Sequence, residues 1–269
     1  MGMAPPQIRR EATDYVHELG VASGNKPAGR WLDPVCPRAI GLDPEKSAVV
    51  EQQVRTVAQT VGAPIARTKC DPNLLLVFTD DAKGIVKSVF RKLQSSGLIA
   101  DRTALETGDY PVRWWYSSDI RTRDNIPPGV VSPALRVETE SSSGILSGGL
   151  QANEDSRSMT QPGSSIVSTQ LKRALTHATV VIDVHGVTGK SLESLVDYAA
   201  FVGLAEVRLG ATAPNSILGL FGSAANIGEL TVTDRAFLTA LYALNLDRRA
   251  EQHRRVLIGQ IIRERTKGN

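Results

Sequence analysis

The segment SLESLVDYAAFVGLAEV, residues 191–207, limits the fold more than any other part of the chain. If this segment is a helix, its apolar residues lie on more than one of its sides. Such a helix is stable only where other elements cover it, because it cannot turn all of its apolar surface away from water by itself. The apolar residues that produce this pattern are Leu192, Leu195, Val196, Ala199, Ala200, Val202 and Gly203. We therefore predict a central, well-buried helix around which the remaining elements pack.

Helix and strand patterns alternate in the first half of the chain, and the second half ends in helices. Asp43 is a good N-cap, Pro44 suits the first helical position, and apolar residues recur on one face after it. The predicted helices are 11–19, 44–61, 82–97, 190–206, 233–244 and 248–266. The predicted strands are an extended stretch around Trp31 and Ile40, then 73–81, 112–121, 164–175 and 178–184.

This order of elements predicts an α/β (α+β) fold with one principal domain. Residues 1–26 are expected to form an N-terminal helical extension, and residues 27–269 the single domain. A stretch rich in Ser and Gly at about 119–165 interrupts that domain. We expect it to form a long loop or a β-hairpin, since long structureless loops inside compact domains are uncommon.

Composition and charge restrict the class of partner. Apolar residues make up 41% of the 269 residues and charged residues 22%, which are ordinary values for a soluble globular protein. The net charge is only +3 with acids and bases mixed, so we expect no nucleic-acid partner. No apolar run approaches the ~20 residues that a membrane helix needs, so we expect no membrane span.

The chain has two cysteines, Cys36 and Cys70, each beside a proline at a predicted strand boundary. Neither has a second cysteine at metal-binding spacing. A disulfide between two neighbouring strands explains such a pair and implies an oxidising compartment. Two buried free thiols in a cytosolic protein are the alternative.

The opening MGMAPPQIRR lacks the apolar core of a signal peptide. It resembles an expression start joined to a mature chain. Together with the isolated cysteine pair, this start predicts a secreted or periplasmic protein whose signal peptide has been removed.

The tripeptide Gly189-Lys190-Ser191 suggests a phosphate-binding loop, but its spacing is wrong. A Walker A loop needs glycine five residues before the second glycine, and that position is Val184. The loop is too short to wrap around a β-phosphate. We predict instead a strand-to-helix turn that uses Gly186 and Gly189, with Ser191 as the helix cap.

Three ionisable residues near this turn are catalytic candidates: Asp183, His185 and Asp197. Asp183 and His185 point to the same face of a strand, an arrangement in which the acid could orient the histidine to act with a serine. No Gly-x-Ser-x-Gly elbow is present to position such a serine. The alternative is that His185 caps the strand end and backbone N–H groups hold Asp183. Asp197 lies on the apolar helix and needs a buried partner, for which Arg113 or Arg173 is expected.

Trp114, Trp115 and Tyr116 concentrate aromatic mass on one predicted strand. Such residues can anchor a binding surface. Because side chains alternate along a strand, one tryptophan is expected to be buried and the other exposed. The alternative is packing in the core with one residue at its rim.

The segments VDYAAFVGL (196–204) and LTVTDRAFLTALY (230–242) together are similar to a pattern of zincin metallopeptidases. These enzymes carry His-Glu-x-x-His-x-x-Gly on a central helix that follows a small sheet. Many also have a Leu-x-x-x-Asp…Leu-x-x-Leu-Tyr segment at the start of the last helix. The chain also resembles a family of uncharacterised bacterial secreted proteins with a degenerate helix of this kind and the same ending. That ending is matched by Leu230, Asp234, Leu238, Leu241 and Tyr242.

Alignment of the zincin glycine with Gly203 places the first histidine at Val196, the glutamate at Asp197 and the second histidine at Ala200. The resemblance covers residues 27–245 in the order of elements. It implies a zincin-like small mixed sheet, a central buried helix and C-terminal helices. A catalytic zinc needs three protein ligands, and the side chains of Val196 and Ala200 cannot provide two of them. We therefore expect no metal and no cofactor.

The expected function is that of a non-catalytic secreted or periplasmic protein on a degenerate metallopeptidase-like scaffold. Such a protein would bind a protein or cell-envelope component through the former cleft and the long loop. The alternative is a hydrolase that uses His185 and Asp183 in the same cleft without a bound zinc.

Overall fold

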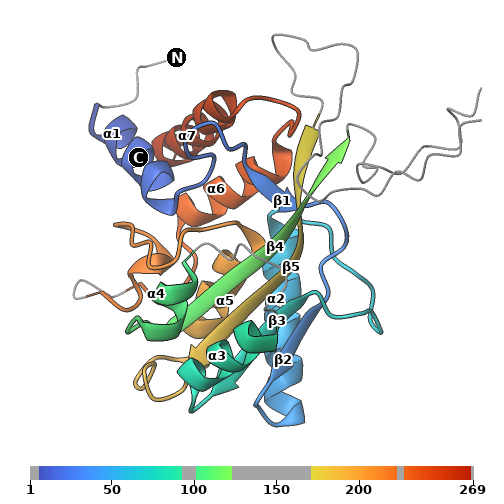
Figure 1. Cartoon of the computed structure of the whole chain (residues 1–269). Coiled ribbons are helices and arrows are strands. Elements are labelled where there is room, and N and C mark those ends of the chain that lie inside the picture. Colours follow the sequence, from blue (N-terminus) through green and yellow to red (C-terminus); the bar gives the residue numbers. More distant parts are fainter. Residues whose placement is uncertain (1–5, 93–100, 123–170, 223–226, 268–269) are drawn as a thin grey trace, which may run out of the picture.

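The computed structural model describes residues 6–92, 101–122, 171–222 and 227–267. Within these ranges the chain has a mixed α/β fold, as predicted, with helices on both faces of one mostly parallel sheet (Figure 1). The strands are β1 (Gly29–Trp31), β2 (Pro37–Ile40), β3 (Leu74–Thr79), β4 (Val112–Thr122) and β5 (Leu171–Asp183). The helices are α1 (Pro6–Leu19), α2 (Pro44–Thr60), α3 (Ala82–Lys92), α4 (Arg102–Thr107), α5 (Leu192–Leu204), α6 (Val232–Ala243) and α7 (Ala250–Lys267), with a short 3-10 helix, η2 (Ile217–Gly219).

The long strand β5 organises the sheet. Along one edge it pairs in parallel with β1 near its start and with β3 over its second half. Along the other edge it pairs with β4, which is antiparallel. The strand β2 extends the sheet beyond β3. Most of the predicted loop at 119–165 lies outside the described residues, and its first four residues belong to β4.

The prediction of two separate strands over 164–175 and 178–184 is wrong for the part that is described. Residues 171–183 form one continuous strand, because the antiparallel β4 pairs with it from Leu171 to Ile182 on both sides of a bulge. The pairing of β4 with β5 shifts register at a bulge between Ser117 and Ser118. This bulge lies opposite the place where the sequence predicted a gap between two strands.

Helices cover both faces of the sheet. On one face, α2 and α5 pack over a core that includes Leu74, Leu76, Val180 and Ile182. On the other face, α3 and α4 cover a smaller cluster: Ala82, Val86, Phe90, Leu105, Trp115 and Val181. Parallel strands with both faces buried require apolar residues on both sides, which the continuous apolar run of β3 provides.

The helices α1, α6 and α7 gather at the end of the molecule that carries β1 (Figure 1). The helix α1, predicted as part of an N-terminal extension, begins earlier than expected and buries Ala12, Val16 and Leu19 in the main core. Residues 6–19 therefore contribute to the same hydrophobic core as the sheet.

Cys36 and Cys70 form the predicted disulfide, with Cα atoms 6.0 Å apart. The two residues precede β2 and β3, which are neighbouring strands, as expected. The bond leaves no free cysteine and points to an oxidising compartment. Among the helices in the described ranges, none has the length and apolar character to cross a membrane.

Candidate functional site

The resemblance to zincins aligns two residues of α5, Val196 and Ala200, with metal-binding histidines, and the structure packs this face of α5 as core. Val196 and Ala200 are both 0% exposed. Gly203 lies on the same side and faces β3, where an added Cβ would approach Leu74 Cδ1 to 2.8 Å. The side of α5 that would carry two histidines therefore lies within the core rather than in an open cleft.

Asp197 has partly buried partners, but not the ones predicted. Its Oδ1 accepts a hydrogen bond from Gln53 Nε2 at 2.7 Å, and its Oδ2 accepts one from Leu230 N at 3.0 Å. The expected arginines bind elsewhere: Arg113 donates to Leu105 O and Gly108 O, and Arg173 pairs with Glu206. Asp197 thus joins α5 to α2 and to the segment before α6.

Asp183 and His185 lie in the turn that follows β5, where the Asp183 carboxylate binds backbone N–H groups. Asp183 Oδ1 accepts hydrogen bonds from His185 N at 3.1 Å and from Gly186 N at 3.3 Å. The His185 side chain is exposed. The carboxylate therefore orients backbone N–H groups, which matches the structural alternative considered for Asp183.

The turn after β5 has the form predicted for it. Gly189 adopts a φ of +83°, a conformation that glycine accepts without strain. Ser191 caps α5, and its Oγ accepts a hydrogen bond from Ser194 N at 3.1 Å. The Gly-Lys-Ser sequence thus serves as a strand-to-helix connection.

The prediction that one tryptophan of β4 is exposed is wrong. Trp114 is 3% exposed and Trp115 is 8% exposed, because α5 covers one face of the strand and α3 the other. Trp115 packs edge-on against Phe90, with ring centroids 5.3 Å apart. Both rings therefore contribute to packing, one on each face of the sheet.

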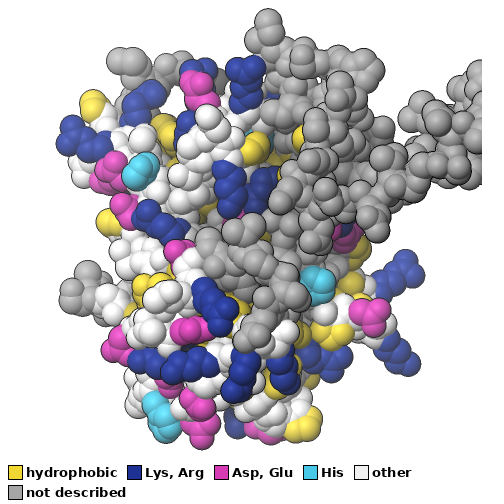
Figure 2. Space-filling model, in the orientation of Figure 1, with side chains coloured by type: hydrophobic (Ala, Val, Ile, Leu, Met, Phe, Trp, Pro, Cys, Tyr) yellow, Lys and Arg dark blue, Asp and Glu magenta, His cyan; other side chains and the backbone are white. Residues whose placement is uncertain are grey.

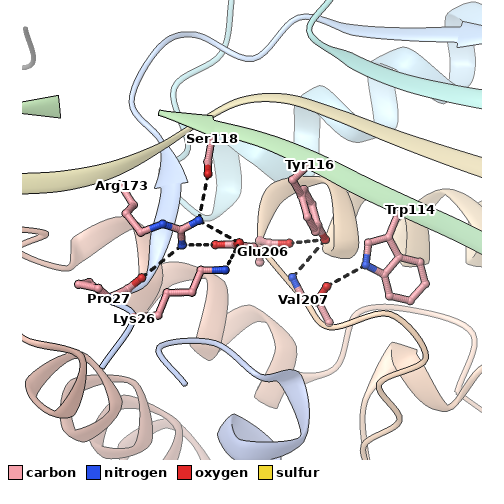
Figure 3. Close-up of polar contacts among 9 residues, drawn as sticks. Lys26, Pro27, Trp114, Tyr116, Ser118, Arg173, Glu206 and Val207 are labelled. Carbon is pink, nitrogen blue, oxygen red and sulfur yellow. Dashed lines mark hydrogen bonds and ion pairs between the residues drawn. The ribbon is translucent and has the colours of Figure 1, made fainter. Parts of the chain in front are cut away.

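The polar atoms of Trp114 and Tyr116 hold the chain that follows α5 (Figure 3). Trp114 Nε1 donates to Val207 O at 2.9 Å. The Tyr116 hydroxyl lies 2.6 Å from Val202 O and accepts from Val207 N at 3.1 Å. Burial raises the pKa of Tyr116 well above its ordinary value, so the hydroxyl stays protonated. These contacts fix the exit of the central helix against β4.

A charged cluster that the sequence did not predict lies beside this exit. The Glu206 cluster consists of Lys26, Ser118, Arg173 and Glu206 (Figure 3). Arg173 Nη2 donates to Glu206 Oε1 at 3.1 Å and to Ser118 Oγ at 3.0 Å, and its Nη1 pairs with Glu206 Oε2. Lys26 Nζ lies 2.8 Å from Glu206 Oε1.

Both carboxylate oxygens of Glu206 are engaged in these ion pairs. Burial alone raises the pKa of Glu206, but the hydrogen bonds and charges of Arg173 and Lys26 outweigh it, and the pKa lies below its ordinary value. A carboxylate held in this way stays ionised and cannot exchange protons readily at neutral pH. The cluster joins β4, β5 and the chain before β1 to the end of α5. The sequence feature that could have indicated this cluster is Arg173 within a predicted strand, because a partly buried cation requires a partner.

His253 is a buried titratable group with both ring nitrogens in use. It is 1% exposed; Nδ1 accepts from Ala28 N at 3.1 Å, and Nε2 lies 3.0 Å from Asn245 O. Because Nδ1 accepts a hydrogen bond, the ring is neutral with its proton on Nε2. Burial lowers the pKa of His253 below its ordinary value.

His253→Gln is expected to remove a pH dependence of stability. Since the folded pKa is lowered, the unfolded chain binds the proton first as the pH falls. The contribution of His253 is complete above the unfolded pKa of about 6.5 and is lost as the pH falls through the folded value. Urea unfolding should show the variant less stable by about 1–3 kcal/mol at high pH, with a smaller difference in acid. His17→Gln, on the exposed side of α1, is the control. If His253→Gln lost the same amount of stability at high and at low pH, the assignment of His253 as a buried neutral histidine would be contradicted.

The described residues contain no group of three or more His, Cys, Asp or Glu side chains placed to hold a metal ion. Comparison of the chain with protein-family models, with curated proteins and with solved structures finds no match. Function therefore has to be inferred from the residues and their arrangement.

Proposed function

We propose that the protein is a non-catalytic binding protein of the periplasm or the cell exterior, on a zincin-like scaffold. The observation that carries the proposal is the packing of α5. Val196 and Ala200 occupy the places of the metal-binding histidines in the resemblance, and both are fully buried in the main core. A catalytic zinc needs protein ligands around an open position, and this face offers neither.

The other ionisable candidates support the same proposal. Asp197 is bound at both oxygens, and Asp183 holds the backbone of a turn. A general acid or base must exchange a proton with the substrate, so a carboxylate that is fully used within the fold is poorly suited to that role. No observation favours a hydrolase built on His185 and Asp183.

The disulfide supports a location outside the cytosol, because such bonds persist in oxidising compartments. In that setting, a protein or a component of the cell envelope is the expected partner.

Metal analysis of the purified full chain tests the proposal. After incubation with zinc and gel filtration, the protein is expected to retain well below one zinc ion per chain, since the face of α5 lacks ligands. Hydrolysis of a casein substrate should stay at the level of buffer, with no change in His185→Ala. One zinc ion per chain that survives filtration, or a casein activity that His185→Ala abolishes, would contradict the proposal.

A further inference from the structure

The outward half of α3 carries four exposed cations: Lys83, Lys87, Arg91 and Lys92, named here the basic face of α3. The other outward residues are Gly84 and Ser88, which are small and half-buried. Residues 82–92 contain no acidic side chain. In Figure 2, a row of Lys and Arg side chains crosses the lower part of the molecule, over the place of α3 in Figure 1.

The opposite side of α3 fixes these cations to a rigid support. Val86 and Phe90 are buried in the cluster that also contains Trp115. At the start of the helix, Asp81 Oδ1 accepts a hydrogen bond from Gly84 N at 2.9 Å. A Cβ on Gly84 would lie 1.9 Å from Asp81 Oδ2, so any other residue would push the Asp81 carboxylate out of this position. The basic face therefore has a defined shape and does not depend on a partner for its order.

The charge of this face is poorly compensated by the described residues. Its one ion pair with them joins Lys83 Nζ to Asp109 Oδ1 at 3.7 Å, and the Asp109 side chain is fully exposed. Such a pair contributes little, because water and salt screen it. The helix α7 differs, since Arg255, Arg265 and Lys267 each pair with a glutamate. On α3, four cations thus stand without any acidic residue in the same helix.

We propose that the basic face of α3 docks the protein on a bilayer with anionic lipid headgroups. This proposal rests on the proposed function, and it identifies the partner of the binding protein as an anionic lipid surface. Protein interfaces usually have an apolar or aromatic anchor near the centre, and none of the exposed large hydrophobic residues among the described ranges lies on α3. A charged lipid surface requires only cations on one side. From Lys83 to Lys92 the helix rises by about 13 Å, which spans several headgroups.

The attraction is electrostatic, so it is reversible and sensitive to salt. Each cation near an anionic membrane surface strengthens binding by about five-fold. The apolar residues of α3 face the sheet: Ile85 and Val89 are half-buried against the cluster that contains Trp115, and no fully exposed large apolar side chain is available to insert, which distinguishes this contact from that of an amphipathic helix embedded in the interface.

Sedimentation of the full chain with lipid vesicles tests the proposal. Vesicles of phosphatidylcholine with phosphatidylglycerol should bind the protein at low salt and release it at high salt, and vesicles of phosphatidylcholine alone should not bind it. The double substitution Lys87→Gln, Arg91→Gln should weaken binding about 25-fold, from five-fold for each cation. The control is Arg9→Gln, Arg10→Gln, which removes the same charge from the exposed side of α1 and should leave binding nearly unchanged. Thermal unfolding checks that both variants are folded.

Three outcomes would overturn this assignment. The first is no binding of the unsubstituted protein to phosphatidylglycerol vesicles at low salt. The second is an equal loss in both double variants, which would mean that total charge rather than α3 governs binding. The third is binding to soluble polyglutamate that depends on Lys87 and Arg91 without binding to vesicles, which would indicate an acidic protein partner. Each outcome is independent of the zinc and casein measurements, so it leaves the proposed non-catalytic function standing.

Discussion

Asp234→Ala is expected to lower the free energy of unfolding by about 4 kcal/mol, which is a large part of the stability of a typical domain. The Asp234 carboxylate is 0% exposed. It accepts hydrogen bonds from Tyr15 Oη at 2.7 Å, Ser216 Oγ at 2.6 Å and Ile217 N at 2.8 Å. It also accepts from Thr231 N at 3.0 Å as part of the capping box of α6. Alanine would leave the buried donors of Tyr15, Ser216 and Ile217, and the partly buried N–H of Thr231, without this acceptor.

The same residue joins segments that are far apart in the chain. Through Tyr15 it ties α1 to α6, and through Ser216 and Ile217 it ties the 3-10 helix η2 to both. Burial, followed by the charge of Asp234, raises the pKa of Tyr15 well above its ordinary value, so the hydroxyl remains a donor. Loss of the carboxylate should therefore loosen three elements at once.

Urea unfolding of Asp234→Ala and Asp234→Asn measures this effect. Asparagine keeps the shape of the side chain but places an NH₂ group opposite some of the donors. Asp234→Asn should therefore lower the free energy of unfolding by about 2–3 kcal/mol, which is less than the loss for alanine. Asp14→Ala is the matched control, because Asp14 is exposed on α1 and its loss should change stability by less than about 0.5 kcal/mol. A cost for Asp234→Ala as small as that of the control would contradict the role assigned to this carboxylate.

Local patterns in the sequence predicted most of the secondary structure. The start of α2 follows from Asp43, whose Oδ1 accepts a hydrogen bond from Lys46 N, and from Pro44 after it. Such signals act within one turn of helix, so they can be read along the chain. The short α4 was missed because it follows Asp101 with a φ of 71° and no side-chain cap, and no local residue marks it.

The partners of charged and aromatic side chains could not be predicted in the same way. Whether Asp197 meets an arginine or Gln53 depends on which helix packs beside α5, and that is decided by the whole core. The burial of Trp115 depends on α3, which covers the second face of the sheet. The disulfide could be predicted because both cysteines mark the starts of strands, and neighbouring parallel strands bring their starts together.

The double substitution Val196→His, Ala200→His places histidines at the two positions that the zincin resemblance assigns to metal ligands, but it is expected to destabilise the protein rather than create a metal site. Both positions are 0% exposed, and Gly203 on the same side contacts Leu74. Two imidazoles would overfill this space and bury polar atoms, at a combined cost of about 4 kcal/mol or more. Zinc should not restore the lost stability, because the core leaves no room for the ion and its ligands.

The matched control places the same pair of histidines on an exposed helix face. Gln52 and Thr56 lie four residues apart on the solvent side of α2, so Gln52→His, Thr56→His should fold as the original chain does. Zinc should raise the melting temperature of this control, since it binds the folded pair more tightly than the unfolded chain. Each single substitution, Val196→His and Ala200→His, is measured as well, so that a failure of the double variant to fold still leaves a stability to compare. If the double variant keeps its stability and binds one zinc ion per chain, the face of α5 is an open metal-binding cleft and the proposal of a non-catalytic protein fails with it.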